Sequence, residues 1–176
     1  MKSTLIAAFV APSIALTAVG IESSTPVADR AYGASVGEFS VEEARAHADA
    51  TFARADLDRS QSLEADEYVA LEIVTAELSR LNGFIALAPD SRGDVVALPI
   101  RKLAALTGGE RARVEAVARG EFYAAAGSDA LLSLGEYAGE RSARFSAADR
   151  NGNGRLAHGE LSSFAAREAL FSRVSA

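Results

Sequence analysis

Residues 149–160, DRNGNGRLAHGE, interrupt alanine-rich, helix-prone sequence with one aspartate, two asparagines and two glycines in six residues. A plain turn between two helices needs only a Gly or an Asn. Here the oxygen-bearing side chains recur at alternate positions, Asp149, Asn151 and Asn153, and Glu160 follows at the end of the stretch. This spacing indicates a loop that holds a cation.

The twelve positions meet the requirements of a hard cation such as Ca²⁺. Such an ion takes about six to eight oxygen ligands, which a twelve-residue loop supplies from positions 1, 3, 5, 7, 9 and 12. Asp149, Asn151 and Asn153 occupy positions 1, 3 and 5, and Glu160 closes the loop at position 12. Gly154 occupies position 6, where a sharp bend favours glycine.

The remaining positions fit the same scheme. Arg155 at position 7 offers its backbone carbonyl, and its charged side chain is expected to point away. Leu156 at position 8 is apolar and is expected to enter the core. Ala157 has no ligand atom, so a water molecule would serve at position 9.

A second copy of the pattern occupies residues 56–67, DLDRSQSLEADE. The expected ligands of this loop are Asp56, Asp58, Ser60, Ser62, Glu64 and Glu67. Leu63 stands at position 8, like Leu156 in the other loop. Phe52 and Phe145 each lie four residues before their loop, where an aromatic side chain would pack between helices.

The second loop departs from the pattern at position 6, where Gln61 replaces glycine. A glutamine adopts the left-handed conformation only at a cost of about 1 kcal/mol or more. The four carboxylates of the loop favour binding in spite of this cost. A degenerate loop with acidic helix caps is the alternative.

Two weaker copies complete a possible set of four. Residues 125–136 keep Leu132 at position 8 and Glu136 at position 12 but lack ligands at positions 1 and 3, and residues 88–99 end in Pro99 and lack the closing carboxylate. If both are degenerate loops, we expect short strands to pair residues 62–64 with 94–96 and 131–133 with 155–157. A β-hairpin over residues 84–99 is the alternative.

Capping boxes mark the starts of three helices. In each, Ser40, Thr107 or Ser133 is followed three residues later by Glu. The expected helices cover about residues 41–55, 63–82, 108–125, 134–148 and 158–172. The second of these carries one apolar face, formed by Leu71, Val74 and Leu78.

The N-terminus has the features of a secretory signal peptide. Lys2 gives a positive start, Leu5 to Val19 is an uncharged apolar run, and small residues precede the expected cleavage after Gly20. A membrane anchor is the alternative, but this run is shorter than the roughly 20 residues that span a membrane. Residues 1–20 are therefore expected to be the signal peptide and 21–39 a flexible leader, in a secreted or periplasmic protein.

The loops resemble those of the EF-hand calcium-binding superfamily, and the signal peptide makes this chain similar to its secreted bacterial members. The resemblance rests on residues 52–67 and 145–160. It implies an all-α fold of helix–loop–helix units with Ca²⁺ as the bound cofactor. We expect two paired lobes, at residues 40–107 and 108–176, with short β strands between their loops.

Composition narrows the function classes. The net charge of −6 disfavours nucleic acid as a partner, and the absence of Cys excludes disulfides and thiolate zinc sites. His47 and His158 belong to no catalytic motif and are expected to be exposed, and no nucleophile elbow or phosphate loop is present, so we do not expect an enzyme.

The sequence therefore predicts a protein that binds about two Ca²⁺ and acts as a buffer, a structural clip or a sensor. Met1 is the only methionine, so a sensor with a methionine-rich target groove is not expected. The alternative is an interaction or scaffold subunit, whose loops only stabilise a surface for an unidentified protein partner.

Overall fold

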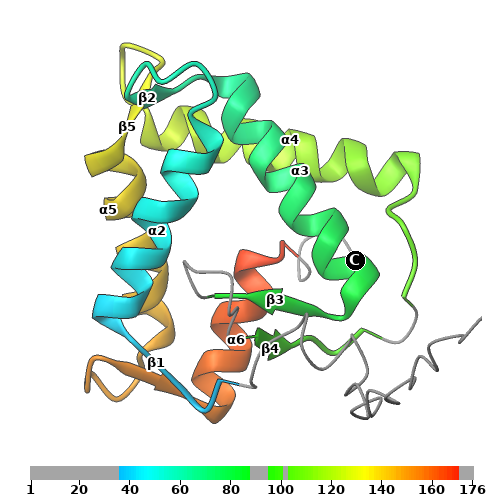
Figure 1. The fold of residues 1–176 in the computed structure, drawn as a ribbon, viewed down its shortest axis with the longest axis vertical. Coiled ribbons are helices and arrows are strands. Elements are labelled where there is room, and N and C mark those ends of the chain that lie inside the picture. The colour runs from blue at the N-terminus through cyan, green and yellow to red at the C-terminus, as the bar shows by residue number, and fades with distance from the viewer. Residues whose placement is uncertain (1–35, 88–94, 101–102, 171–176) are drawn as a thin grey trace, which may run out of the picture.

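The computed structural model describes residues 36–87, 95–100 and 103–170, and this part of the chain is mostly helical with three small antiparallel sheets (Figure 1). Its helices are α2 (Val41–Ala55), α3 (Ala65–Asn82), α4 (Gly108–Ala125), α5 (Leu134–Ala148) and α6 (His158–Glu168). Its strands are β1 (Glu38–Ser40), β2 (Ser62–Leu63), β3 (Phe84–Ala86), β4 (Val95–Ala97), β5 (Leu132–Ser133) and β6 (Arg155–Ala157). The expected signal peptide at 1–20 lies outside the described residues. None of the described helices is long and apolar enough to cross a membrane.

The three predicted capping boxes are present. The hydroxyl of Ser40 accepts a hydrogen bond from the backbone N–H of Glu43 at 3.2 Å, and Glu43 Oε2 accepts one from the N–H of Ser40 at 2.7 Å. Thr107 and Ser133 make the same reciprocal pair of bonds at the starts of α4 and α5. Each box satisfies two N–H groups that a helix start leaves unpaired, and the helix starts agree closely with the prediction.

The last helix ends earlier than predicted. α6 stops at Glu168 because Leu170 adopts a left-handed conformation with φ of 52° and donates its N–H to the carbonyl of Arg167 at 2.9 Å. A left-handed residue after the last turn ends a helix in this way. The predicted end at about residue 172 is therefore wrong.

The pairing of the strands also differs from the prediction. Leu63 of β2 lies opposite Leu132 of β5, and Phe39 of β1 lies opposite Leu156 of β6. α2 leads from β1 to β2 while α5 leads from β5 to β6, and the two helices pack side by side in opposite directions (Figure 1). Each end of this helix pair therefore carries one sheet, and both strand pairs cross the predicted lobe boundary. The predicted pairs of 62–64 with 94–96 and of 131–133 with 155–157 are wrong.

β3 and β4 form the hairpin that was the alternative for this segment. Ile85 lies opposite Val96, so β4 pairs with the strand just before it. The predicted degenerate loop 88–99 is preceded by a strand in place of a helix, and its residues 88–94 lie outside the described residues.

The predicted leader also extends too far along the chain. It was expected to reach residue 39, but Glu38–Ser40 form β1, and Phe39 is buried against the rest of the fold. Most of residues 21–39 lie outside the described residues.

Two hydrophobic cores lie at the two ends of the α2–α5 pair. One contains Phe52 and Leu63, and the other contains Phe145 and Leu156. Both phenylalanines are buried as predicted, and both leucines at loop position 8 are fully buried at 0% exposure. Each loop is thus attached to its own core by the leucine at position 8.

The covered face of α3 differs from the predicted one and includes polar residues. Glu72, Ala76 and Ser79 are buried, whereas Val74 and Leu78 are 53% and 52% exposed. α3 packs on α4, where the small side chain of Ala76 belongs to a cluster with Val114 and Leu170. Of the predicted apolar stripe, Leu71 packs against the core that contains Phe52, whereas Val74 and Leu78 are half exposed and line a cavity.

Candidate metal centre

The loop at 56–67 connects α2 to α3 and folds around the carboxylate of Asp56. Asp56 Oδ1 accepts a hydrogen bond from the backbone N–H of Ser60 at 2.9 Å, and Oδ2 accepts one from that of Gln61 at 3.0 Å. Asp58 Oδ1 accepts from the same N–H of Ser60 at 3.0 Å. These bonds hold the side chains of positions 1 and 3 on the inner side of the loop.

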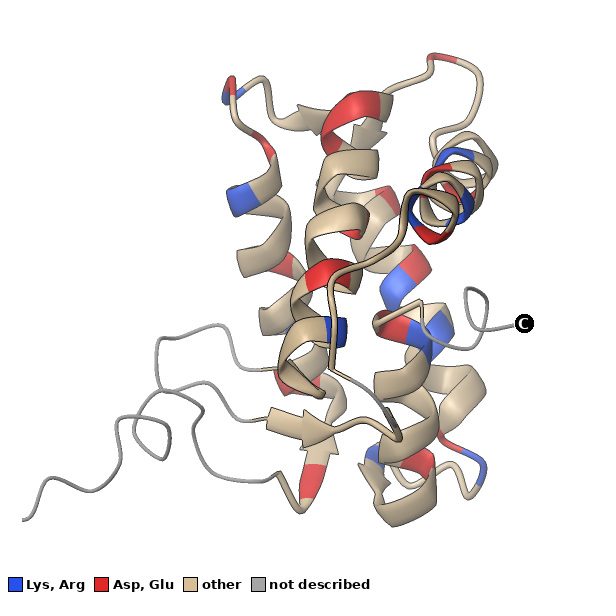
Figure 2. Cartoon of the chain, turned by 90° about the vertical axis from the view of Figure 1, so that its right-hand side faces the viewer, with Lys and Arg blue, Asp and Glu red and all other residues tan. Residues whose placement is uncertain are grey.

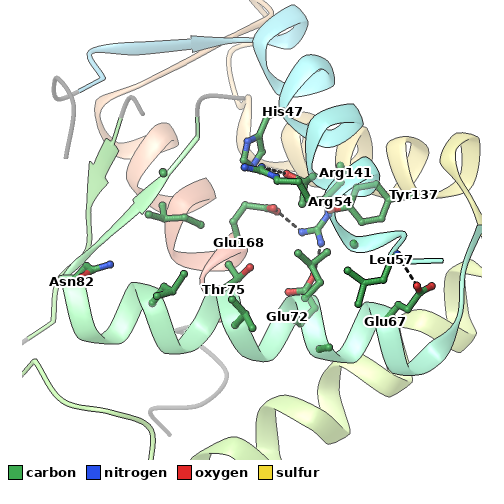
Figure 3. Close-up of a pocket in the computed structure, with 18 of the residues that line it drawn as sticks. His47, Arg54, Leu57, Glu67, Glu72, Thr75, Asn82, Tyr137, Arg141 and Glu168 are labelled. Carbon is green, nitrogen blue, oxygen red and sulfur yellow. Dashed lines mark hydrogen bonds and ion pairs between the residues drawn. The ribbon is translucent and has the colours of Figure 1, made fainter. Parts of the chain in front are cut away.

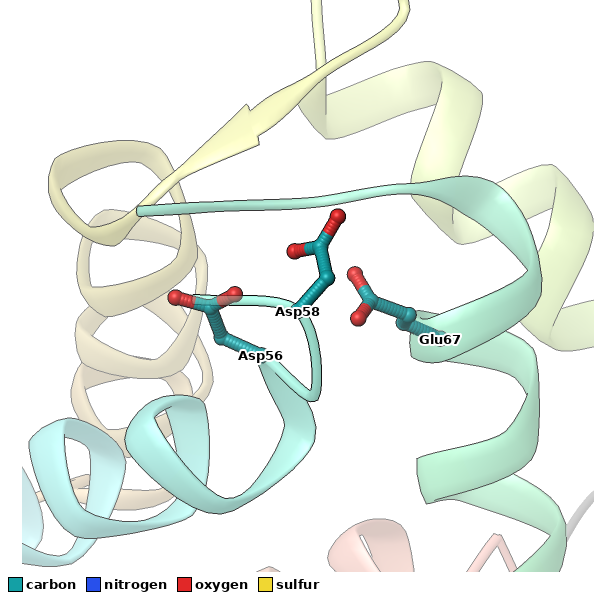
Figure 4. Close-up of side chains that lie close together, drawn as sticks. All are labelled: Asp56, Asp58 and Glu67. Atoms are coloured by element: carbon teal, nitrogen blue, oxygen red, sulfur yellow. The ribbon is translucent and has the colours of Figure 1, made fainter. Parts of the chain in front are cut away.

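Glu67 closes the loop from the first turn of α3. Its Oε1 accepts a hydrogen bond from the N–H of Leu57 at 2.9 Å, and its Oε2 accepts one from the N–H of Glu64 at 3.1 Å. One carboxylate oxygen from each of Asp56, Asp58 and Glu67 lies within 4.8 Å of the others (Figure 4). Two oxygens bound to the same Ca²⁺ lie at most roughly 5 Å apart, so the three carboxylates fit such an ion.

Of the other predicted ligands of this loop, Ser60 and Ser62 lie close together, whereas Glu64 lies apart. The hydroxyl of Ser60 donates to the carbonyl of Ser62 at 2.8 Å, so the ligand atoms of positions 5 and 7 lie side by side. Glu64 is exposed at the N-cap of α3 and lies outside the carboxylate cluster.

The loop at 149–160 connects α5 to α6 and is held by the corresponding bonds. Asp149 Oδ1 accepts from the N–H of Asn153 at 3.2 Å, and Oδ2 accepts from that of Gly154 at 2.8 Å. Asn151 Oδ1 accepts from the N–H of Asn153 at 3.0 Å. Glu160 Oε1 accepts from the N–H of Arg150, at position 2, at 3.0 Å.

The two loops also share their backbone conformation. Positions 4 and 6 are left-handed in both, with φ of 62° at Arg59 and 68° at Gln61, and 69° at Gly152 and 73° at Gly154. The expected left-handed conformation of Gln61 is confirmed. The first loop therefore keeps the shape of the second although neither of these positions is a glycine.

The remaining side chains of the second loop bind one another, the backbone or the body of the protein. The amide nitrogen of Asn151 donates to both oxygens of Glu160, at 3.2 and 3.3 Å. Asn153 Oδ1 accepts from the N–H of Arg155 at 2.8 Å, and the guanidinium of Arg155 pairs with Glu38 at 3.1 Å. The charged side chain at position 7 therefore points away from the loop, as predicted.

The third loop, at 125–136, keeps Asp129 at position 5 and its closing residue, Glu136. Glu136 Oε2 accepts from the N–H and the hydroxyl of Ser133, at 2.9 and 2.7 Å. Ala125 and Gly127, at positions 1 and 3, carry no oxygen side chains. This loop serves as the partner of the loop at 56–67 through the β2–β5 sheet.

The partner of the loop at 149–160 was not anticipated from the sequence. It is the segment that ends in β1, where Phe39 stands opposite Leu156 and Glu43 takes the place of a closing glutamate. An apolar residue followed four residues later by Glu occurs in all four segments, at residues 63, 132, 156 and 39. This spacing in the sequence could have identified residues 39–43 as the partner of the loop at 149–160.

A cluster of buried charges between the two cores was also not anticipated. Arg141 of α5 pairs with Glu168 of α6 at 2.6 Å and with Glu72 of α3, and all three side chains are buried (Figure 3). Arg144 pairs with Glu168 at 3.3 Å. Burial raises the pKa of Glu72 because Arg141 does not fully offset the lost hydration, whereas Arg141 and Arg144 together outweigh burial and lower the pKa of Glu168.

His47 lies beside this cluster and not on an exposed helix face, so the expectation of an exposed side chain is wrong. Burial lowers its pKa to about 4, and the nearby Arg141 and Arg54 act in the same direction while Glu168 acts against them. Its Nδ1 has no hydrogen-bond partner in the described part of the chain. His158 is exposed, as predicted.

Basic and acidic residues are interspersed along the helices (Figure 2). No family model matches the sequence, and neither a curated protein nor a solved structure shows detectable similarity to it.

Proposed function

We propose that the chain is a secreted or periplasmic, non-enzymatic calcium-binding protein of the EF-hand type, with one Ca²⁺ in each of the loops at 56–67 and 149–160. One observation carries the proposal. In both loops the N–H groups of positions 5 and 6 bind the position-1 carboxylate, and the N–H of position 2 binds the closing glutamate. A loop that served only as a turn would not need the same arrangement of three hydrogen bonds twice.

The proposed ligands follow from this arrangement. In the first loop they are Asp56, Asp58, Ser60, the carbonyl of Ser62, Glu67 and, directly or through water, Glu64. In the second they are Asp149, Asn151, Asn153, the carbonyl of Arg155 and Glu160, with water at position 9. All are oxygen ligands, as a hard cation requires, and no sulfur or imidazole is among them.

The attachment of the loops favours a structural role for the ion. Leu63 and Leu156 are fully buried in the two cores, so each loop is fixed to the body of the protein at position 8. An ion that binds only the folded loop stabilises the fold by mass action. Extracellular sites with dissociation constants on the order of 10⁻⁴–10⁻³ M stay occupied where calcium is plentiful and act in this way.

Calorimetric titration with Ca²⁺ tests the proposal, using residues 21–176 after removal of metal with a chelator. Two binding events would support both loops, and one event would restrict binding to a single loop. No heat of binding up to millimolar Ca²⁺ would overturn the proposed function.

A second measurement separates a structural clip from a sensor. A clip raises the unfolding temperature on Ca²⁺ addition and leaves the binding of a hydrophobic dye unchanged. A sensor exposes apolar surface, and dye binding rises with Ca²⁺. A scaffold subunit would retain its protein partner in chelator.

A further inference from the structure

A cavity of about 530 Å³ lies between the two cores, bounded by α2, α3, β3, α5 and α6 (Figure 3). Sites for small organic molecules have volumes of about 300–1,000 Å³. The cavity is separate from the proposed calcium ligands except at one end, where Leu57 and Glu67 contribute to its wall.

One wall of the cavity is apolar. It is formed by the stripe of α3 that carries Leu71, Val74 and Leu78, facing Ala55 of α2. Val74 and Leu78 are 53% and 52% exposed, so about half of each side chain is free to be covered. An apolar molecule in the cavity would remove this surface from water.

The floor of the cavity is charged and buried. Glu72 is only 1% exposed, and its Oε1 accepts a hydrogen bond from Arg141. Glu72 is one of the residues that line the cavity, and its buried Oε2 has no hydrogen-bond partner among residues 36–87, 95–100 and 103–170. Buried carboxylate oxygens normally have a partner, so this one calls for a donor from outside the described chain.

The charges around this oxygen favour a donor that is positively charged. Arg141 contacts the carboxylates of Glu72, Glu140 and Glu168, and Arg144 contacts the last two of them and also that of Glu121. Four carboxyl groups therefore face two guanidinium groups, so the cluster keeps a net negative charge even when Glu72, whose pKa is raised by burial, is protonated. A neutral apolar molecule would leave both that charge and Glu72 Oε2 uncompensated.

We propose that the cavity binds a small organic cation with an apolar body, in which a protonated amino group donates to Glu72 Oε2 and the body lies along Leu71, Val74 and Leu78. The apolar wall supplies most of the contact surface, and the carboxylate fixes the orientation. No bond is made or broken, so the site is a binding site and not a catalytic one. The proposal does not depend on calcium binding.

Titration with n-octylammonium, n-octanol and octanoate tests the proposal, each ligand below its aggregation concentration. The full chain is used with excess chelator, so that failure of the calcium sites does not affect the result. The expected result is saturable one-to-one binding of octylammonium. Octanol should bind roughly ten- to hundredfold more weakly, because it lacks the charge-assisted hydrogen bond, and octanoate should not bind.

Two variants locate the site. Glu72→Gln removes the charge at constant shape and should reduce octylammonium affinity about tenfold or more, while octanol affinity stays the same. The matched control is Glu115→Gln, which removes one exposed carboxylate on α4 and should change neither affinity. Leu78→Trp fills the apolar end without touching a buried charge, so it should abolish binding while circular dichroism shows an intact fold.

Several outcomes would overturn the proposal. They are equal affinity for octylammonium and octanol, unchanged octylammonium affinity in folded Glu72→Gln, unchanged affinity in folded Leu78→Trp, and the absence of saturable binding. If Glu72→Gln does not fold, the comparison of the three ligands with wild-type protein and with Leu78→Trp decides the question.

Discussion

Leu63 of β2 lies directly opposite Leu132 of β5, and the two side chains are 0% and 1% exposed. The first belongs to a loop with a complete set of proposed ligands, and the second belongs to a loop that lacks two of them. The sheet thus joins a candidate calcium loop to a loop that supports it without an ion.

Leu63→Ala should therefore destabilise the protein strongly. Truncating a fully buried leucine to alanine costs about 2–5 kcal/mol, because transfer free energy is lost and a cavity remains. Urea unfolding in chelator measures this cost without any contribution from calcium. The control is Leu131→Ala, a neighbouring leucine that is 40% exposed, and its cost should be well below 1 kcal/mol. Equal costs for the two variants would contradict the packing described here.

Glu160→Gln should remove most calcium binding from the loop at 149–160. The substitution keeps the length of the side chain but takes away the charge at the closing position. Calorimetry should show the stoichiometry fall from two to one, with an affinity loss of about tenfold or more at the altered site. Glu115→Gln, far from either loop in sequence, should leave both sites intact. Unchanged stoichiometry and affinity in Glu160→Gln would refute the assignment of this loop.

Gln61→Gly should tighten calcium binding to the loop at 56–67. Gln61 holds a φ of 68°, which costs about 1 kcal/mol for a residue with a side chain and almost nothing for glycine. The greater freedom of glycine in the unfolded chain offsets part of this relief of strain. We therefore expect the free energy of unfolding of the calcium-loaded protein to rise by about 0.5–1 kcal/mol.

Ser62→Gly is the matched control for this change, because Ser62 lies in the same loop but has no positive φ. It should weaken binding or leave it unchanged. Should Gln61→Gly bind calcium no more tightly than wild type, either the strain at position 6 or the site itself has been assigned wrongly.

His47 should make the stability of the protein depend on pH below neutrality. Its pKa of about 4 in the fold lies below the value of 6.5 of an exposed histidine, so the unfolded chain takes up the proton first as the pH falls. Stability is therefore full above about pH 6.5 and is lost progressively down to about pH 4. Between pH 7 and pH 5 the loss should be roughly 2 kcal/mol.

Urea unfolding of wild type and His47→Gln in chelator measures this effect. Glutamine cannot take up the proton, so the difference in stability between the two proteins should shrink or change sign as the pH falls. Parallel pH profiles would show that His47 does not titrate in the way its burial requires.

Much of the local structure could be predicted from the sequence, because it depends on neighbours in the chain. Ser40, Thr107 and Ser133 start helices through a glutamate three residues away, and the burial of Leu63 and Leu156 follows from their place in the loop. The partners of the strands could not be predicted in this way. Every loop offers the same short strand around position 8, so the choice depends on how α2 and α5 pack in space.

The cavity and its charges could not be predicted for a related reason. The stripe of Leu71, Val74 and Leu78 indicates a core-facing side of a helix, but α4 covers the side with Ala76 instead. Glu72 and Arg141 resemble ordinary surface residues in the sequence. Only the convergence of α3, α5 and α6 brings them together and buries them.

Glu67 lies in both of the proposed sites. It is the closing carboxylate of the loop at 56–67, and it also contributes to the wall of the cavity, as does Leu57, whose N–H it binds. If both sites fill, an ion that moves Glu67 changes the affinity of the cavity by some factor, and thermodynamic linkage requires the cavity ligand to change the affinity for the ion by the same factor. The two ligands would then be coupled. The affinity for calcium would rise or fall when an amine occupies the cavity, and the affinity for the amine would change by the same factor when calcium is bound.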